Sequence, residues 1–177
     1  MASAQGGAVR KEEAFMEELT KQSNPQTEML FAGYMYNKSN PKKPMHLHAD
    51  KIWSGEIYKD YNFPEVLDET DERASFALKA DWGDVIKSAV VYSLKTGEHH
   101  FNHYAFLLAW SYNFVQGRRV RKVYVRCGLL ENFSKINWEN VEKELDASTP
   151  SSSYIDALTR TSVKAHIDAN VVYADFM

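Results

Sequence analysis

Three of the six histidines in this 177-residue sequence lie within five positions, in the segment GEHHFNHYAF at residues 97–106. His99 and His103 are four residues apart, and on a helix this spacing places two imidazoles on the same face. Zinc enzymes often bind their metal through such a pair. The segment is therefore a candidate metal or catalytic centre, and a small metal-dependent enzyme is one hypothesis for the protein.

A zinc site needs further ligands besides this histidine pair. The candidates that the sequence offers are His46, His48 and Glu98. Neither an H-E-x-x-H motif nor a cysteine–histidine spacing typical of zinc sites is present. The alternative is that the histidines, including His100, form the polar entrance to a buried helix, where they can respond to pH near neutrality. We favour this alternative and expect no metal and no cofactor.

The single cysteine, Cys127, alternates with Val123 and Val125, which predicts a strand whose Cys127 side chain points into the core. The sequence has no G-x-S-x-G, Walker or G-x-G-x-x-G motif. We therefore expect no catalytic residue and a protein that is not an enzyme. One cysteine cannot form an internal disulfide, and the N-terminus lacks the apolar segment of a secretory signal, so we expect the protein not to be secreted.

Positive charge is concentrated in two segments. Five bases and no acid occur in the first, and they are Arg118, Arg119, Arg121, Lys122 and Arg126. The second contains Lys42 and Lys43. Such residues bind phosphate groups of RNA or of anionic lipids, so these seven are the predicted contacts for a membrane or a nucleic acid. The alternatives for the first segment are that its charges offset a helix dipole or protect an edge strand from pairing.

The pattern of apolar, β-branched and aromatic residues predicts the secondary structure. Strands are expected at residues 28–36, 45–49, 74–82, 85–94, 120–130 and 163–173. Helices are expected at residues 10–22, 102–116 and 137–145, with a helical turn at residues 154–158. Apolar side chains surround the segment 102–116 on nearly all sides, which is typical of a helix buried in a core.

The predicted fold class is α+β, in which a mostly antiparallel β-sheet packs against this central buried helix with short flanking helices. We expect residues 1–25 to be a flexible N-terminal tail with a short helix. Residues 26–177 are expected to form a single α+β domain. Acidic residues are concentrated between residues 56 and 84, with nine acids against three bases. This separation from the basic segments suits self-association.

The order of elements in residues 73–130 resembles that of the matrix proteins of rhabdoviruses, particularly the plant-infecting members. The segments that carry the resemblance are ASFALKADW, HYAFLLAWSYNFVQG and RRVRKVYV, with the closing alternation TSVKAHIDANVVYADF. The segments RKEEAF and NPKKP match the flexible basic N-terminal part of that family. The P-P-x-Y motif of many animal-virus members is absent.

The resemblance implies a non-enzymatic viral structural protein that self-associates and bridges an anionic membrane and the nucleocapsid during budding. Its implied partners are further copies of itself, the nucleocapsid, an anionic membrane surface and RNA. Its implied location is the virion, and the cytoplasm or cytoplasmic membrane face of the host cell. An alternative hypothesis is a nucleic-acid-binding viral or cytosolic protein, such as a capsid component or silencing suppressor, that uses the basic strand.

Overall fold

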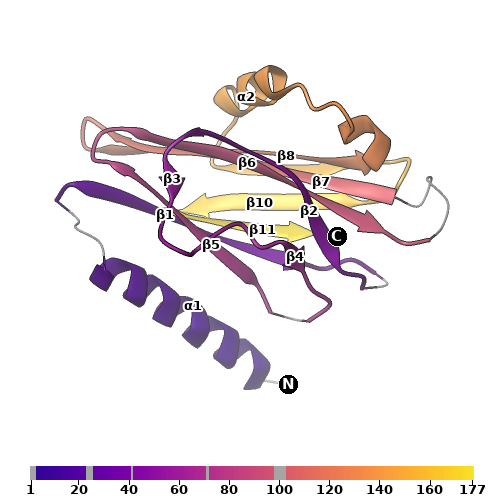
Figure 1. The fold of residues 1–177 in the computed structure, drawn as a ribbon, viewed down its shortest axis with the longest axis horizontal. Coiled ribbons are helices and arrows are strands. Elements are labelled where there is room, and N and C mark those ends of the chain that lie inside the picture. The colour runs from indigo at the N-terminus through magenta and orange to yellow at the C-terminus, as the bar shows by residue number, and fades with distance from the viewer. Residues whose placement is uncertain (1–2, 23–25, 41, 71, 98–102) are drawn as a thin grey trace.

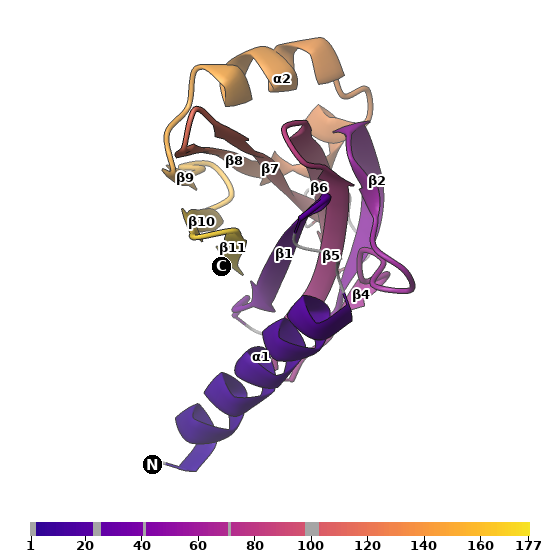
Figure 2. The ribbon, with the colours of Figure 1, turned by 90° about the vertical axis from the view of Figure 1, so that its left-hand side faces the viewer.

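The computed structural model describes residues 3–22, 26–40, 42–70, 72–97 and 103–177. Two β-sheets pack face to face as a sandwich, and one helix lies on the outer face of each sheet (Figures 1 and 2). Neighbouring strands pair in antiparallel fashion, with the exception of the parallel pair β1–β11.

The first sheet has six strands. In the order in which they pair, these are β3 (Glu56–Ile57), β5 (Ala74–Asp81), β1 (Glu28–Asn37), β11 (Val171–Phe176), β10 (Ser162–Asp168) and β9 (Ser151–Ile155). The second sheet has five strands. In the same sense, these are β4 (Val66–Leu67), β2 (Met45–Ser54), β6 (Val85–Lys95), β7 (His103–Val115) and β8 (Arg118–Leu129).

The helices cover the outer faces of the sheets. Helix α1 (Ser3–Gln22) begins earlier than the predicted segment 10–22 and lies on the six-stranded sheet through Phe15 and the buried Leu19. Helix α2 (Trp138–Asp146) lies on the five-stranded sheet through Val141 and Leu145, and it follows the short 3₁₀ helix η2 (Leu130–Phe133). The prediction of a helix at residues 137–145 is confirmed.

The predicted central helix at residues 102–116 is wrong, and the fold class built on it is wrong as well. From His103 the segment forms strand β7, which pairs with β6 on one side and β8 on the other. Phe106, Leu108 and Trp110 point between the sheets. Leu107 and its neighbouring alanines point outward beneath α2. Because both faces of the strand are buried, it has no polar face, and its apolar run cannot be distinguished from a buried helix by periodicity.

The C-terminal part differs from prediction in two places. The predicted single strand at 163–173 is the hairpin β10–β11, which turns at Ala169 (φ 50°) and Asn170. After this turn the positions that face the other sheet change from odd to even numbers, so β11 directs Val172 and Ala174 into the core between the sheets. The helical turn expected at 154–158 begins instead in the edge strand β9. The other predicted strands are confirmed, with ends shifted by a few residues.

Aromatic rings fill the space between the sheets. The indole of Trp110 is fully buried and contacts Phe76 of the opposite sheet at 4.9 Å between ring centroids. Phe31 and Phe63 pack against the same indole. Trp110 therefore joins strands of both sheets to one core.

Gly33 makes room for this core. It lies opposite Phe76 in the β1–β5 pair, and a Cβ atom at residue 33 would overlap the Phe76 ring. We expect Gly33→Ala to lower the free energy of unfolding by about 1–3 kcal/mol, because an added methyl in a filled core forces neighbouring groups to move. Urea denaturation followed by tryptophan fluorescence measures this change.

The double variant Gly33→Ala/Phe76→Leu is the control for this mechanism. Since the smaller leucine gives the methyl space, the double variant should lose less stability than the sum of the two single variants. Strict additivity of the two losses would show that the clash with Phe76 is not the cause.

Candidate binding site

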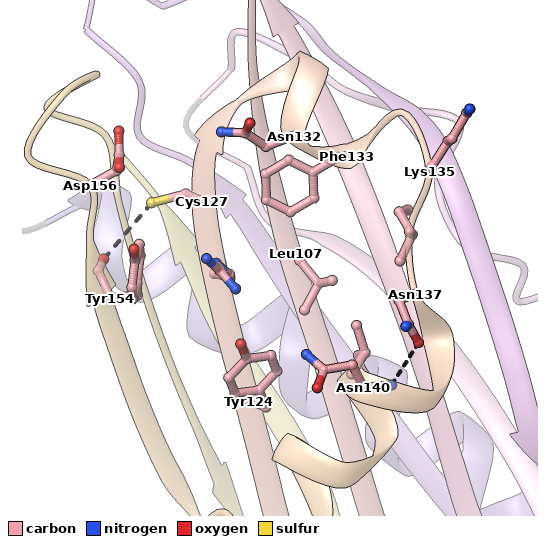
Figure 3. Close-up of a pocket in the computed structure, with 13 residues that line it drawn as sticks. Leu107, Tyr124, Cys127, Asn132, Phe133, Lys135, Asn137, Asn140, Tyr154 and Asp156 are labelled. Atoms are coloured by element: carbon pink, nitrogen blue, oxygen red, sulfur yellow. Dashed lines mark hydrogen bonds between the residues drawn. The ribbon is translucent and has the colours of Figure 1, made fainter.

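A pocket of about 260 Å³ lies on the outer side of the five-stranded sheet, between β8, β9 and the η2–α2 segment (Figure 3). Residues of β7, β8, η2, α2 and β9 and of the connections beside them line it. They are Leu107, Tyr124, Arg126, Cys127, Asn132, Phe133, Lys135, Ile136, Asn137, Asn140, Val141, Tyr154 and Asp156. The pocket thus combines aromatic rings, amides and charges of both signs above an apolar floor.

The side of the pocket toward β9 carries its opposite charges. The Arg126 guanidinium lies over the Tyr154 ring, 5.9 Å from its centroid, a distance at which cation and ring attract each other. The Asp156 carboxylate accepts hydrogen bonds from the Thr159 hydroxyl (2.6 Å) and backbone N–H (2.8 Å). These bonds, together with the positive charge of Arg126, lower the pKa of Asp156, so this carboxylate is ionised at neutral pH.

The opposite wall depends on the position of α2. Asn137 caps this helix, since its side-chain oxygen accepts a hydrogen bond from the Asn140 N–H at 2.9 Å. Lys87 on β6 holds the helix from below through ion pairs with Glu142 (3.0 Å) and Asp146 (2.9 Å). Burial alone would lower the pKa of Lys87, but hydrogen bonds to these two carboxylates and their charges outweigh it and raise the pKa. The wall is therefore fixed to the sheet by paired charges.

Two exposed apolar side chains lie close in the chain to the pocket residues Tyr154 and Asp156. Ile155 is 70% exposed and Leu158 is 77% exposed, and both lie within two residues of the pocket residue Asp156. Because side chains alternate along β9, Ile155 points to the face of the strand opposite Tyr154, whereas Leu158 lies in the β9–β10 loop. A polar pocket at the same end of the sandwich as these exposed aliphatic side chains suits a ligand that is itself amphipathic.

The five bases between residues 118 and 126 do not form one patch. Because side chains alternate along a strand, Arg119 and Arg121 share the inner side of β8 with Val123, whereas Lys122 and Arg126 share the outer side with Tyr124. Lys122 donates a hydrogen bond to the carbonyl of Asp146 at the end of α2. Of the seven basic residues predicted to contact a membrane or a nucleic acid, Arg126 lines the pocket.

The predicted contacts also divide between the two ends of the sandwich. Arg118 and Arg119 lie at the β7–β8 hairpin, about 35 Å from the far end of β8 at ~3.3 Å per residue. Lys42 and Lys43 lie in the β1–β2 loop at that far end. Asn37 at the end of β1 pairs with Phe176 of β11, Phe176 pairs with Val163 of β10, and Val163 pairs with Tyr154 of β9. The β9–β10 loop, which carries Leu158, therefore lies at the same end. We call this end, with Lys42, Lys43, Ile155 and Leu158, the pocket end, and the other the hairpin end.

The histidine cluster receives no support as a metal site. His99, His100 and Glu98 lie outside the described residues, and His103 begins a strand instead of extending a helix. Among the residues that the structure describes, no three His, Cys, Asp or Glu side chains are grouped as metal ligands would be. Cys127 points into the core as predicted, and burial raises the pKa of its thiol.

Most of the pocket was not predicted from the sequence. The residues without a prediction include Tyr124, Asn132, Lys135, Asn140, Tyr154 and Asp156. One local signal was available, because Asn132, Asn137 and Asn140 place three amides within nine residues. The contribution of Tyr154 and Asp156 had no local signal, since it depends on β9 lying beside β8.

The fold and the pocket define a two-sheet β-sandwich protein with an outward-facing polar pocket. The chain is 26% identical over 183 residues to a jasmonate-induced protein homolog of Atriplex canescens, covering 98% of this chain and 95% of that protein. In structure it is similar to the lipid binding protein Nakanori, with a TM-score of 0.64 and 14% identity over 97% of this chain and 78% of that one. No family model matches the chain. The structural similarity establishes the fold.

These similarities correct the expected family. The resemblance to rhabdovirus matrix proteins is wrong, because the chain aligns over nearly its full length with a plant protein and shares its fold with a lipid-binding one. The implied virion location, nucleocapsid partner and role in budding are withdrawn with it. The same holds for the capsid or silencing-suppressor alternative. Neither similar protein is named as an enzyme. In the described part of the chain, no helix is long and apolar enough to cross a membrane.

The bonds to Asp156 predict an acid-dependent stability. A carboxylate whose pKa is lower in the folded than in the unfolded chain stabilises the fold above its unfolded pKa of about 3.9. This contribution disappears as the pH falls through the lowered folded value. We expect Asp156→Asn to lower the Tm at pH 7, with the difference from the unsubstituted protein shrinking toward pH 2.

Differential scanning calorimetry over this pH range measures the effect. The exposed Asp60, which lies on the β3–β4 connection away from the pocket, provides the matched control Asp60→Asn. A Tm difference for Asp156→Asn that stays constant with pH would show that the hydrogen bonds to Thr159 do not depend on ionisation of this carboxylate.

Proposed function

We propose that this protein is a non-enzymatic lipid-binding β-sandwich that attaches to a membrane surface through its pocket end. The observation that carries the proposal is that the exposed Ile155 and Leu158 lie within two residues of the pocket residue Asp156, at the same end of the sandwich as the polar pocket. A lipid presents the matching arrangement, in which a polar headgroup lies directly above apolar chains. The shared fold with a protein named for lipid binding supports this reading.

The pocket chemistry indicates which part of the headgroup it holds. Arg126 and Lys135 are the cations of the lining, and guanidinium and ammonium groups are the usual protein partners of phosphate. Asp156 and the ring of Tyr154 can receive a cationic group next to that phosphate. The pocket therefore suits a phosphate-bearing headgroup, with aliphatic side chains entering the interface beside it.

Lys42 and Lys43 extend the contact at this end. They share the pocket end with Leu158, so a flat surface that meets Leu158 also approaches these lysines. Lysines close to an anionic bilayer contribute roughly 1 kcal/mol each at moderate salt. The predicted role of Lys42, Lys43 and Arg126 in membrane contact is therefore part of this proposal, whereas Arg118 and Arg119 lie at the wrong end for it.

Vesicle sedimentation tests the apolar part of the contact. We expect Ile155→Ser/Leu158→Ser to weaken binding to phosphatidylcholine vesicles, with or without phosphatidylserine, at least about tenfold, because two aliphatic side chains no longer leave water. The control is Val115→Ser, since Val115 is also exposed but ends β7 at the hairpin end. If Ile155→Ser/Leu158→Ser binds vesicles as tightly as the wild-type protein, attachment through the pocket end is excluded.

The variant Arg126→Gln tests the pocket. It should weaken binding to vesicles of either composition, because both lipids carry the phosphate that the pocket is proposed to hold. Titration with inorganic phosphate and with a neutral sugar shows whether the pocket binds a phosphate group or a carbohydrate. Binding of the free sugar, with no binding to any vesicle, would show that the asparagines and tyrosines of the pocket recognise a carbohydrate and that the lipid proposal is wrong.

A further inference from the structure

The hairpin end of the sandwich carries a second exposed apolar group. Trp82 lies in the turn between β5 and β6, and its side chain is 53% exposed. Its ring packs against Phe114 at the end of β7, with 5.3 Å between centroids. Val115 and Val120 on the adjacent β7–β8 hairpin are exposed as well. An indole held by a neighbouring ring while half of it faces solvent is preorganised for contact with another molecule.

The charges around this group are separated by sign. The β5–β6 turn carries Asp81 and Asp84 without a base, and the β7–β8 turn carries Arg118 and Arg119 without an acid. All four side chains are exposed. In the part of the chain that the structure describes, none of the four forms a side-chain hydrogen bond or ion pair with the rest of the molecule. The Trp82–Phe114 contact shows that the acidic and the basic turn are neighbours.

An acidic half, an apolar centre and a basic half make a surface that is complementary to itself. A two-fold axis through the Trp82 region places the acidic turn of one copy against the basic turn of the other, and the reverse contact forms at the same time. A uniformly anionic membrane would instead be repelled by Asp81 and Asp84, and a uniformly basic partner by Arg118 and Arg119. The charge pattern thus favours a second copy of this chain over either.

We propose that the hairpin end is a homodimer interface, in which Trp82, Val115 and Val120 form the apolar centre and the two turns exchange ion pairs. The interface lies at the opposite end from the pocket, so dimer formation leaves both pockets open and directs them away from each other. The proposal does not rest on lipid binding, because its contacts and its test involve the protein alone.

Sedimentation equilibrium of charge-reversed chains tests the interface. One variant is Asp81→Arg/Asp84→Arg, in which both turns are basic, and the other is Arg118→Asp/Arg119→Asp, in which both are acidic. Each should dimerise at least tenfold more weakly than the wild-type chain, because like charges then meet across the axis. An equimolar mixture of the two should form a heterodimer, since every contact between them is again between opposite charges.

Three further measurements make the result specific. Lys95→Asp changes a charge at the far end of β6 and should leave the dimer unchanged. Trp82→Ala should weaken the dimer without reversing any charge, and sodium chloride should weaken the wild-type dimer by screening the ion pairs. Thermal unfolding of each variant establishes that it is folded.

Three outcomes would overturn the proposal. The first is a wild-type chain that remains a monomer at every concentration. The second is a dimer that neither charge reversal weakens, which would place the interface on another face. The third is a Trp82→Ala chain that dimerises as tightly as the wild-type chain, which would show that Trp82 is not at the centre of the interface.

Discussion

Strand β7 must be buried on both faces, and the rest of the molecule is arranged to meet this requirement. Its inner side chains, with Trp110 at their centre, need an opposing sheet, which the six-stranded sheet supplies. Its outer side chains, including Leu107, need a cover as well, because the exposed apolar face of a sheet is unfavourable in water. The segment η2–α2 provides that cover, and Lys87 fixes it through its two carboxylate partners.

The candidate site is a consequence of this cover being incomplete. Helix α2 has only nine residues and lies above β7 and β8, so it leaves a space between itself and the edge strand β9. Tyr124 projects into this space from β8, while Tyr154 and Asp156 border it from the β9 side (Figure 3). Arg126 of β8 lines the same space. Structural necessity thus brings together a helix cap, an edge strand and the outer face of a sheet. None of these three elements forms the pocket alone.

The strands of this fold were largely predictable, whereas its site was not. The strands around Ala77 and Val90 were identified because polar residues interrupt their apolar runs more often than in β7. Asn137 marked the start of α2, because asparagine is a common N-cap residue. The basic segment was correctly placed on a strand, but treating it as one patch ignored the alternation of its side chains. Arg119 and Arg126 therefore belong to different surfaces, although they are only seven residues apart.

The amino-acid sequence by itself determined the positions of most strands, the inward direction of Cys127 and the absence of an internal disulfide, because these depend on local periodicity and on composition. The tertiary structure decided that residues 103–115 form a strand, since a segment apolar on every side has no polar face from which its period can be identified. It also decided which residues share the pocket. Arg126 and Tyr154 are 28 positions apart, and their contact depends on how β9 returns beside β8 after α2. Contacts of this kind leave no pattern in the neighbouring sequence.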